Sequence, residues 1–359
     1  MKDAEEGVVC VEEGSAGIAR LNRPKALNAL TFAMIERLEA FLHSCAANRR
    51  VRGVMLEAEG KAFCAGGDIR AIRDLAADAP EEANRFYAAE YQHNWSLACF
   101  PKPHVALIDG AVMGGGVGVS LYGSHRVAGE NFRFAMPETG IGFVPDIGGS
   151  WFLPRLPGRT GLYLALTGAA CDRDDAYALG LATHCVPSEG FAAIRAAMVE
   201  GELIDTVLDG LHEPPGESAL EAMREPIDRL FAAPSLEALF RGLERENGRW
   251  RNFAHATLET LSKRSPLALH LTFELHRRAN AFASLKEALT LEYRVATRLI
   301  RHADFAEGVR AAVIDKDRSP KWTHATIGAV DAGLVESFFA PLPAGDVPLI
   351  DHWRLHTRP

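Results

Sequence analysis

The stretch GGGVGVSLYGSHRVAGENFRFAMPETGIGFVPDIGG, residues 114–149, is the part of the chain around which the rest is organised. It holds two glycine clusters and two acidic residues, Glu138 and Asp146, each directly after a proline. Prolines and glycines disfavour a continuous helix here, so the backbone can fold back and bring the two carboxylates together. The apolar neighbours indicate partial burial, and a pair of carboxyls in a partly dry site suits acid/base or nucleophilic chemistry. The alternative is a surface loop with two solvated acids.

Two glycine turns, at residues 65–67 and 114–116, present backbone N–H groups without side chains in the way. Each follows an apolar segment and precedes a predicted helix, and the first amides of a helix are unpaired and carry partial positive charge. Two such turns that converge would form an oxyanion hole for a carbonyl that gains negative charge. The alternative is that the glycines only permit tight turns or close packing. The presence of both turns beside a carboxylate loop favours the oxyanion hole.

Several competing motifs are absent from the glycine-rich stretch. It departs from the dinucleotide pattern G-x-G-x-x-G because Val119 stands at the last position, and the phosphate loop G-x-x-x-x-G-K-[ST] is missing. Ser120 lies in GVSLYG, which is not the nucleophile elbow G-x-S-x-G. The sequence therefore predicts catalysis by carboxylates and not by a serine.

The first half of the chain alternates predicted strands, glycine turns and helices. Residues 8–22 read as a hairpin, and 52–58 and 104–108 as apolar strands. Thr31 is placed as a helix N-cap, because apolar residues recur behind it at helical spacing. This alternation predicts an α/β domain with largely parallel strand pairing.

After about residue 190 the strand-like runs become rare and helical periods dominate. We therefore expect a catalytic core over 1–190 and a helical C-terminal extension over 191–359. The catalytic residues should lie in the first part.

Composition and charge exclude several classes of protein. The 359 residues are 48% hydrophobic and 24% charged, with a formal net charge of −8, as in an ordinary globular protein. A basic cluster rich in aromatics, which would indicate a nucleic-acid partner, is missing. The first residues are acidic where a secretory signal would be basic, and apolar runs fall short of the roughly 18 residues of a membrane helix. We expect a cytoplasmic protein without nucleic-acid or membrane partners.

The cysteines and histidines give no metal-site signal strong enough to predict one. The six cysteines are widely spread without a C-x-x-C pair, which favours free thiols in a reducing compartment. His352 and His356 have the i,i+4 spacing that can bind a metal on a helix. They lie near the chain end without a carboxylate cluster in the neighbouring sequence, so we interpret them as surface residues.

At this point the chain resembles the crotonase superfamily, also called the enoyl-CoA hydratase/isomerase family. The resemblance rests on four segments in the family's order, which together cover about the first 190 residues: RPKALNAL, KAFCAGGDI, PHVALIDGAVMGGGVGVS and FAMPETGIGFVPDIGG. It implies a crotonase-like spiral of ββα turns and a coenzyme A thioester as substrate. It also implies an oxyanion hole from the amides of Gly67 and Gly115, and no cofactor beyond the coenzyme A of the substrate.

Within the superfamily, the chain is similar to the 3-hydroxyisobutyryl-CoA hydrolase subgroup. Hydratases resemble it at Glu138 but carry a second glutamate where this chain has Gly118, and usually glycine where it has Asp146. The loop MPETGIGFVPDIGG and the late segment 305–322 are similar to the hydrolases. The resemblance implies hydrolysis of a short β-hydroxyacyl-CoA thioester, as in valine breakdown.

The resemblance also implies roles for individual residues. Glu138 would attack the thioester carbonyl or activate water, and Asp146 would orient the substrate hydroxyl and assist proton transfer. Glu90 aligns with an acidic substrate contact, with a helix-surface charge as the alternative. The remaining expected substrate-binding residues are Ala65 and Asp68, together with Arg23 and Lys25 for the coenzyme phosphates; the alternative for the two basic residues is a solvated basic loop.

Other interpretations of the same residues stay open. Within the fold they are an enoyl-CoA isomerase or hydratase and a dehalogenase with a nucleophilic aspartate; outside enzymes, a coenzyme A-binding protein without activity. Family members often form trimers or hexamers, so a homo-oligomer is expected unless the helical tail covers the same surface within one chain.

Overall fold

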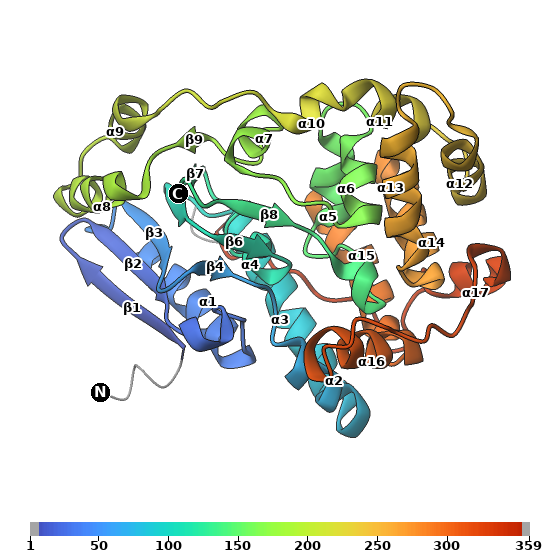
Figure 1. Cartoon of the computed structure of the whole chain (residues 1–359). Coiled ribbons are helices and arrows are strands. Elements are labelled where there is room, and N and C mark those ends of the chain that lie inside the picture. The colour runs from blue at the N-terminus through green and yellow to red at the C-terminus, as the bar shows by residue number, and fades with distance from the viewer. Residues whose placement is uncertain (1–6, 354–359) are drawn as a thin grey trace.

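The computed structural model describes residues 7–353 and contains two sheets flanked by helices (Figure 1). The larger sheet has the order β1-β2-β3-β5-β7-β9, formed by Val8–Glu13, Ala16–Leu21, Gly53–Ala58, His104–Ile108, His125–Ala128 and His184–Cys185. The smaller sheet has the order β4-β6-β8, formed by Ala62–Cys64, Ala111–Met113 and Arg133–Ala135.

The strand order reveals a structural repeat. β1 and β2 form the predicted antiparallel hairpin, whereas every other neighbouring pair in both sheets is parallel. β3, β5 and β7 lie in the larger sheet, and each is followed directly by a strand of the smaller sheet. The chain thus winds forward by one ββ unit at a time, and helical segments follow each unit. The predicted α/β fold with a spiral of ββα turns is confirmed.

The helices of the first half are α1 (Phe32–Ala47), α2 (Ile69–Asp78), α3 (Pro80–Ala98), α4 (Gly115–Gly118), α5 (Gly149–Phe152), α6 (Thr160–Thr167) and α7 (Arg173–Ala178). The helices predicted after Thr31 and after the two glycine turns are present among them as α1, α2 and α4. Thr31 caps α1 as predicted, because its hydroxyl accepts a hydrogen bond from the Met34 amide at 3.3 Å. The apolar face of α1, including Ile35, Leu38 and Leu42, is buried, and the helix packs against α3 and the larger sheet.

Between Phe191 and Trp353 the described elements are helices, as predicted. They are α8 (Phe191–Glu200), α9 (Ile204–Leu211), α10 (Ala219–Ala222), α11 (Arg224–Leu230), α12 (Leu236–Arg245), α13 (Arg251–Ser262), α14 (Pro266–Arg278), α15 (Leu285–Leu299), α16 (Ala303–Val309) and α17 (Ala332–Ser337). α15 packs against α3 and α5, and α16 packs against α2. One cluster of buried apolar side chains continues across both halves of the chain. The boundary at residue 190 stays a prediction.

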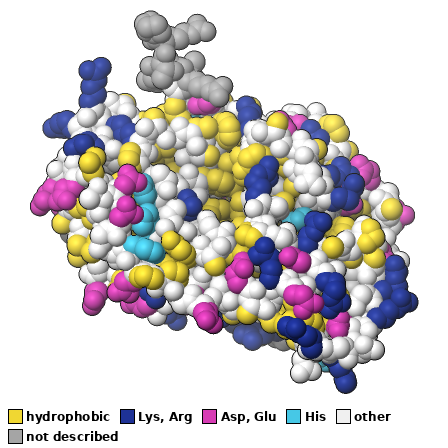
Figure 2. Space-filling model, turned by 90° about the horizontal axis from the view of Figure 1, so that it is seen from above, with side chains coloured by type: hydrophobic (Ala, Val, Ile, Leu, Met, Phe, Trp, Pro, Cys, Tyr) yellow, Lys and Arg dark blue, Asp and Glu magenta, His cyan; other side chains and the backbone are white. Residues whose placement is uncertain are grey.

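The surface mixes both signs of charge. On the face drawn in Figure 2, acidic and basic side chains are interspersed around a band of hydrophobic ones. Among residues 7–353, the helices fall short of the length and apolar character that crossing a membrane requires.

Candidate active site

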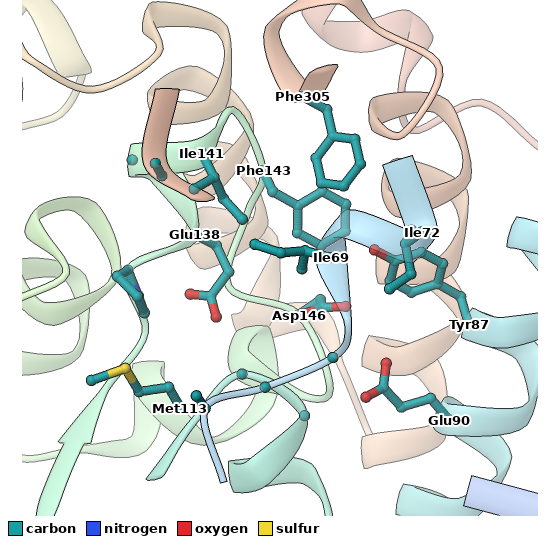
Figure 3. Close-up of a pocket in the computed structure, with 18 of the residues that line it drawn as sticks. Ile69, Ile72, Tyr87, Glu90, Met113, Glu138, Ile141, Phe143, Asp146 and Phe305 are labelled. Atoms are coloured by element: carbon teal, nitrogen blue, oxygen red, sulfur yellow. The ribbon is translucent and has the colours of Figure 1, made fainter. Parts of the chain in front are cut away.

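A cavity of about 300 Å³ lies where the spiral meets the helices of the second half (Figure 3). Its walls come from the turns after β4 and β6, from α2 and α3, from the loop 137–146, and from Arg264 and Phe305. Six of the predicted site residues line it: Ala65, Gly67, Glu90, Gly115, Glu138 and Asp146. The fold therefore brings the glycine turns and the carboxylates to one place.

The two glycine turns meet backbone to backbone. A Cβ atom built on Gly115 would lie 3.4 Å from the amide nitrogen of Gly67. Gly66 and Gly114 have φ angles of 108° and 46°, a conformation that side chains with a Cβ disfavour, so glycine is needed to make each turn. Within residues 7–353, neither the Gly67 nor the Gly115 amide donates to a backbone oxygen. Two free donors side by side are what an oxyanion hole requires.

Glu138 and Asp146 are buried in the same cavity. They are 7% and 4% exposed, so the alternative of a surface loop with two solvated acids is wrong. Glu138 opens a 3₁₀ turn (Glu138–Ile141, η3) directly after Pro137, and Figure 3 shows its carboxylate and that of Asp146 directed into one space. Among the residues that the structure describes, Oε2 of Glu138 has no hydrogen-bond partner. This oxygen is therefore available to a substrate.

Asp146 is oriented by a tyrosine. The Tyr91 hydroxyl donates to Oδ2 of Asp146 at 2.6 Å. Burial raises the pKa of Asp146 to about 7, while the hydrogen bond from Tyr91 acts in the opposite direction. Burial also raises the pKa of Glu138 well above 4.5; the charge of Asp146 adds to this rise, and the nearby guanidinium of Arg264 opposes it. Asp146 can therefore exchange its proton near neutral pH, and Glu138 keeps its proton to a higher pH than an exposed glutamate does.

Glu90 adds a third carboxyl from α3. It is 3% exposed and its Oε1 lacks a partner among the described residues, so the alternative of a helix-surface charge is wrong. Burial, and then the charge of Asp146, raise its pKa well above 4.5. Because the three carboxyls are buried in one cavity, the charge of Asp146 disfavours ionisation of both Glu90 and Glu138.

Three predicted substrate-binding residues are absent from the cavity wall. Arg23 forms an ion pair with Asp68 at 3.1 Å. Asp68 also caps α2, since its side chain accepts from the Ala71 amide at 3.3 Å. Lys25 is exposed. Contacts of these residues with a bound coenzyme stay predictions.

Three residues at or beside the site were not predicted from the sequence: Tyr91, Arg264 and Glu292. Tyr91 directly follows Glu90 in the sequence. Its hydroxyl, next to a predicted site residue, was the one sign that it could take part in the site. Arg264 lines the cavity and donates a hydrogen bond to the Thr167 carbonyl, across a separation that local pattern cannot predict. Glu292 lies on the apolar face of α15. A single acidic residue among leucines at helical spacing could have been recognised in the sequence as unusual.

Gly118, where hydratases of the family have a second glutamate, faces Asn94. A Cβ atom at Gly118 would lie 2.6 Å from the Asn94 side-chain nitrogen, and Asn94 is fully buried. The space into which a side chain at position 118 would extend is thus already filled. The structure gives a physical reason why this chain holds one glutamate of the hydratase pair.

We predict that Gly115→Ala lowers kcat/KM for the thioester that the family resemblance implies as substrate by about 10²-fold, because a misplacement of about 1 Å in a catalytic group has that effect. The new Cβ would lie 2.4 Å from Oε1 of Glu90, so the turn or the carboxylate must move. Gly210→Ala is the matched control, since a Cβ there has open space. Steady-state kinetics of both variants check the prediction; equal activity of the two would contradict it.

Within residues 7–353 the six cysteines form no disulfide bonds, as predicted, and each is buried or half-buried. His352, interpreted from the sequence as a surface residue, is half-buried, and one of its ring nitrogens lies within 4.8 Å of side-chain atoms of Glu39 and His43 on α1. The sequence could not show this, because His352 is far from the other two in the chain. His356 lies outside the described residues.

Comparison with known proteins agrees with this geometry. A family model described as enoyl-CoA hydratase/isomerase matches residues 16–339. A Danio rerio protein named "3-hydroxyisobutyryl-CoA hydrolase, mitochondrial" is 42% identical, over 94% of this chain and 90% of its own length. The Homo sapiens protein of the same name is 39% identical, over 96% and 91%. A crystal structure described as that of a carnitinyl-CoA dehydratase from Mycobacterium thermoresistibile superposes with a TM-score of 0.90 at 37% identity, over 97% of this chain and 99% of that one.

Proposed function

The chain belongs to the enoyl-CoA hydratase/isomerase family, and from this we propose that it hydrolyses 3-hydroxyisobutyryl-CoA to 3-hydroxyisobutyrate and coenzyme A. It is an acyl-CoA thioester hydrolase of the 3-hydroxyisobutyryl-CoA hydrolase subgroup. The observation that carries the proposal is the meeting of two free glycine amides with the buried carboxyls of Glu138 and Asp146 in one cavity. Relatives of that name match almost the whole chain.

In the proposed reaction, the amides of Gly67 and Gly115 bind the thioester oxygen and stabilise its negative charge. Glu138 acts in one of two ways. As a nucleophile, its carboxylate forms a bond to the carbonyl carbon, the C–S bond breaks, and water then cleaves the mixed anhydride. As a general base, it takes a proton from the water that attacks the same carbon. In both cases the coenzyme leaves as a thiol after taking up a proton.

Asp146 would hold the substrate hydroxyl, with Tyr91 fixing the carboxyl that makes this contact. Apolar side chains such as Ile69 and Phe143 line the space beside it and suit the short branched carbon chain (Figure 3). The proposed chemistry needs no cofactor beyond the coenzyme A of the substrate.

The test of the function is thiol release from four thioesters: 3-hydroxyisobutyryl-, 3-hydroxypropionyl-, acetyl- and crotonyl-CoA. We expect rapid release from the two β-hydroxy thioesters and slow release from the others. Loss of the crotonyl-CoA absorbance without thiol release would instead indicate a hydratase, an activity closer to the dehydratase named for the mycobacterial structure. If neither thiol release nor a change in crotonyl-CoA absorbance occurred, the enzymatic proposal would be overturned and a coenzyme A-binding protein favoured.

We predict that kcat/KM falls as the pH is lowered through about 7, because burial raises the pKa of Asp146 to about 7 and that of Glu138 above 4.5. A carboxyl with a raised pKa is protonated, and so unable to act as base or nucleophile, at a pH where an exposed one is charged. A profile from about pH 5 to about pH 9 checks this. Asp146→Asn should move the remaining acid limb to lower pH, since the charge that raises the pKa of Glu138 is removed. An acid limb near 4.5 in the wild type would contradict the prediction.

The cellular location and the oligomeric state have to be determined separately from the reaction. The sequence-based expectation of a cytoplasmic protein finds no support in the names of the relatives, which place those proteins in mitochondria. Cell fractionation would decide the location, and sedimentation of the purified protein would decide whether a homo-oligomer forms.

A further inference from the structure

The loop that carries Asp146 contains a strained residue. Ile147 has φ 51°, in the left-handed region that a β-branched side chain strongly disfavours, and it is 1% exposed. Gly148 follows at φ 86°. Backbone in this conformation persists only where the surroundings over-determine it, and such residues gather at functional sites.

Two side chains hold the backbone on either side of the strain. The Tyr122 hydroxyl donates to the Ile147 carbonyl at 2.7 Å. The carboxylate of Glu292 accepts from the Gly148 amide at 2.6 Å, and from the Ser150 amide at 2.7 Å and the Ser150 hydroxyl at 2.6 Å. Every one of these contacts falls within five residues of Asp146.

Burial of the Glu292 carboxyl costs free energy. It is 0% exposed and occupies an otherwise apolar stripe of α15 that includes Leu289 and Val295. Burial raises its pKa to about 8; the Ser150 hydroxyl and the two amides oppose the rise, and the charge of Asp146 adds to it. Its hydrogen-bond partners among residues 7–353 are two amides and a hydroxyl, none of which carries a positive charge. An apolar residue would serve packing better at this position, so stability alone does not explain a carboxyl here.

We propose that Glu292 is a positioning residue for the hydrolysis, which acts through Asp146 by holding residues 146–150 in the strained conformation. This inference rests on the proposed function. If so, the helical second half contributes to the reaction, because α15 packs against α5 and holds the loop that carries Asp146.

The test compares Glu292→Gln with Glu287→Gln, an exposed glutamate on the same helix. The amide group of glutamine cannot accept from all three donors, because one of its two polar atoms is itself a donor. We expect Glu292→Gln to lower kcat about 10- to 100-fold with a smaller change in KM, as for a misplaced catalytic group. Glu287→Gln should retain wild-type kinetics.

A double-mutant cycle separates positioning from general damage. If Glu292 acts through Asp146, the variant Asp146→Asn/Glu292→Gln should be no slower than Asp146→Asn alone. Multiplicative losses, or an unaffected Glu292→Gln, would overturn the inference. Hydrogen exchange of the Gly148 and Ser150 amides should also become faster in Glu292→Gln. This readout does not need turnover, so it tests the loop even if the wild type proves not to be a hydrolase.

A second and independent observation is the group formed by Glu39, His43 and His352. One ligand atom from each lies within 4.8 Å of the other two. Nε2 of His43 and Oε1 of Glu39 are 3.3 Å apart, long for a charge-assisted hydrogen bond. Two ligands at about 2.0–2.1 Å from Zn²⁺ in tetrahedral geometry are separated by roughly 3.3 Å. The spacing thus suits two ligands of one metal ion.

Neighbouring residues hold the members of this group in place. The Glu39 carboxylate accepts from the Ser96 hydroxyl at 2.6 Å and contacts Nδ1 of His93 at 2.9 Å, which fixes its orientation. The segment that carries His352 is tied down as well, because the ring nitrogen of Trp353 donates to the Ser96 carbonyl at 2.9 Å. Two imidazoles and one carboxylate form a donor set typical of zinc with one open position.

We propose that Glu39, His43 and His352 form a Zn²⁺ site that fastens the C-terminal segment to α1, apart from the catalytic cavity. Titration of tag-free, chelator-treated protein with Zn²⁺ tests it. We expect about one equivalent bound and a raised Tm, as linkage requires of a ligand that binds the folded state. Both should be lost in His43→Ala and in His352→Ala and kept in His255→Ala, an exposed histidine elsewhere. Equal binding by all variants, or none by the wild type, would overturn the proposal.

Discussion

Glu138→Gln is expected to lower kcat for 3-hydroxyisobutyryl-CoA by about 10²–10⁴-fold, the range that a positioned proton-transfer group contributes. Glutamine keeps the shape of the side chain but can neither attack the carbonyl carbon nor take a proton from water. The fold should be unaffected, because Oε2 of Glu138 has no partner to lose within residues 7–353. Thiol-release kinetics together with thermal denaturation check both halves of this expectation.

The matched control for this variant is Glu217→Gln, an exposed glutamate remote from the cavity lining. It should show wild-type kinetics. If Glu138→Gln retained near-normal hydrolysis, the assignment of the catalytic carboxylate would be wrong. If it accumulated no product but still bound the substrate, with heat released on mixing, the binding role of the glycine turns would be separated from the chemistry.

Asp146→Asn is expected to lower turnover of the β-hydroxy thioesters by about 10²–10³-fold, with a much smaller effect on acetyl-CoA, which has no hydroxyl to hold. Asparagine can still accept the Tyr91 hydrogen bond, so the side chain should stay in place. Asp78→Asn, at an exposed position on α2, is the control. An equal loss on hydroxylated and unsubstituted thioesters would remove the proposed recognition of the hydroxyl by Asp146.

The same variant should gain stability, and the gain depends on pH. The pKa of Asp146 is about 7 in the folded chain against a usual value of 3.8, so between these values the folded chain binds a proton that the unfolded chain releases. Stability contributed by this group therefore falls as the pH rises through that window. Removing the charge should raise Tm more at about pH 8, above the window, than at about pH 5, inside it. Lost activity with gained stability is typical of a functional site.

Much of the fold was predictable because local signals and long-range structure agree. The hairpin, the Thr31 cap and the strands at 53–58 and 104–108 each carry their own pattern, and the glycines at the turns allow little else. The meeting of Glu138 with Asp146 was also predictable, since prolines and glycines leave that loop few options. The substrate class came from the resemblance of four segments to a family, and not from any of these patterns.

The contacts across the chain were not predictable. Tyr91 reaches Asp146 across 55 positions and Arg264 reaches Thr167 across 97, and no periodicity encodes which side chains meet at such separations. The proximity of His352 to Glu39 and His43 was not predictable for the same reason. Glu292 differs from these residues. A charged residue on an otherwise apolar helix face is visible in the sequence and indicates a polar partner, although it does not say which partner.

The hydrogen bond between Glu292 and Gly148 joins residues 144 positions apart, and this sets the order in which the enzyme can mature. As the chain leaves the ribosome, the strands of the spiral can pair long before α15 exists, because domains fold as their residues emerge. Until α15 docks, the strained loop lacks the hydrogen bonds of Glu292, although the Tyr122 hydroxyl can already reach the Ile147 carbonyl. A nascent or prematurely terminated chain therefore holds both carboxylates and both glycine turns but positions Asp146 less firmly. We expect cleavage of thioesters to reach its full rate only once α15 has been made and has docked.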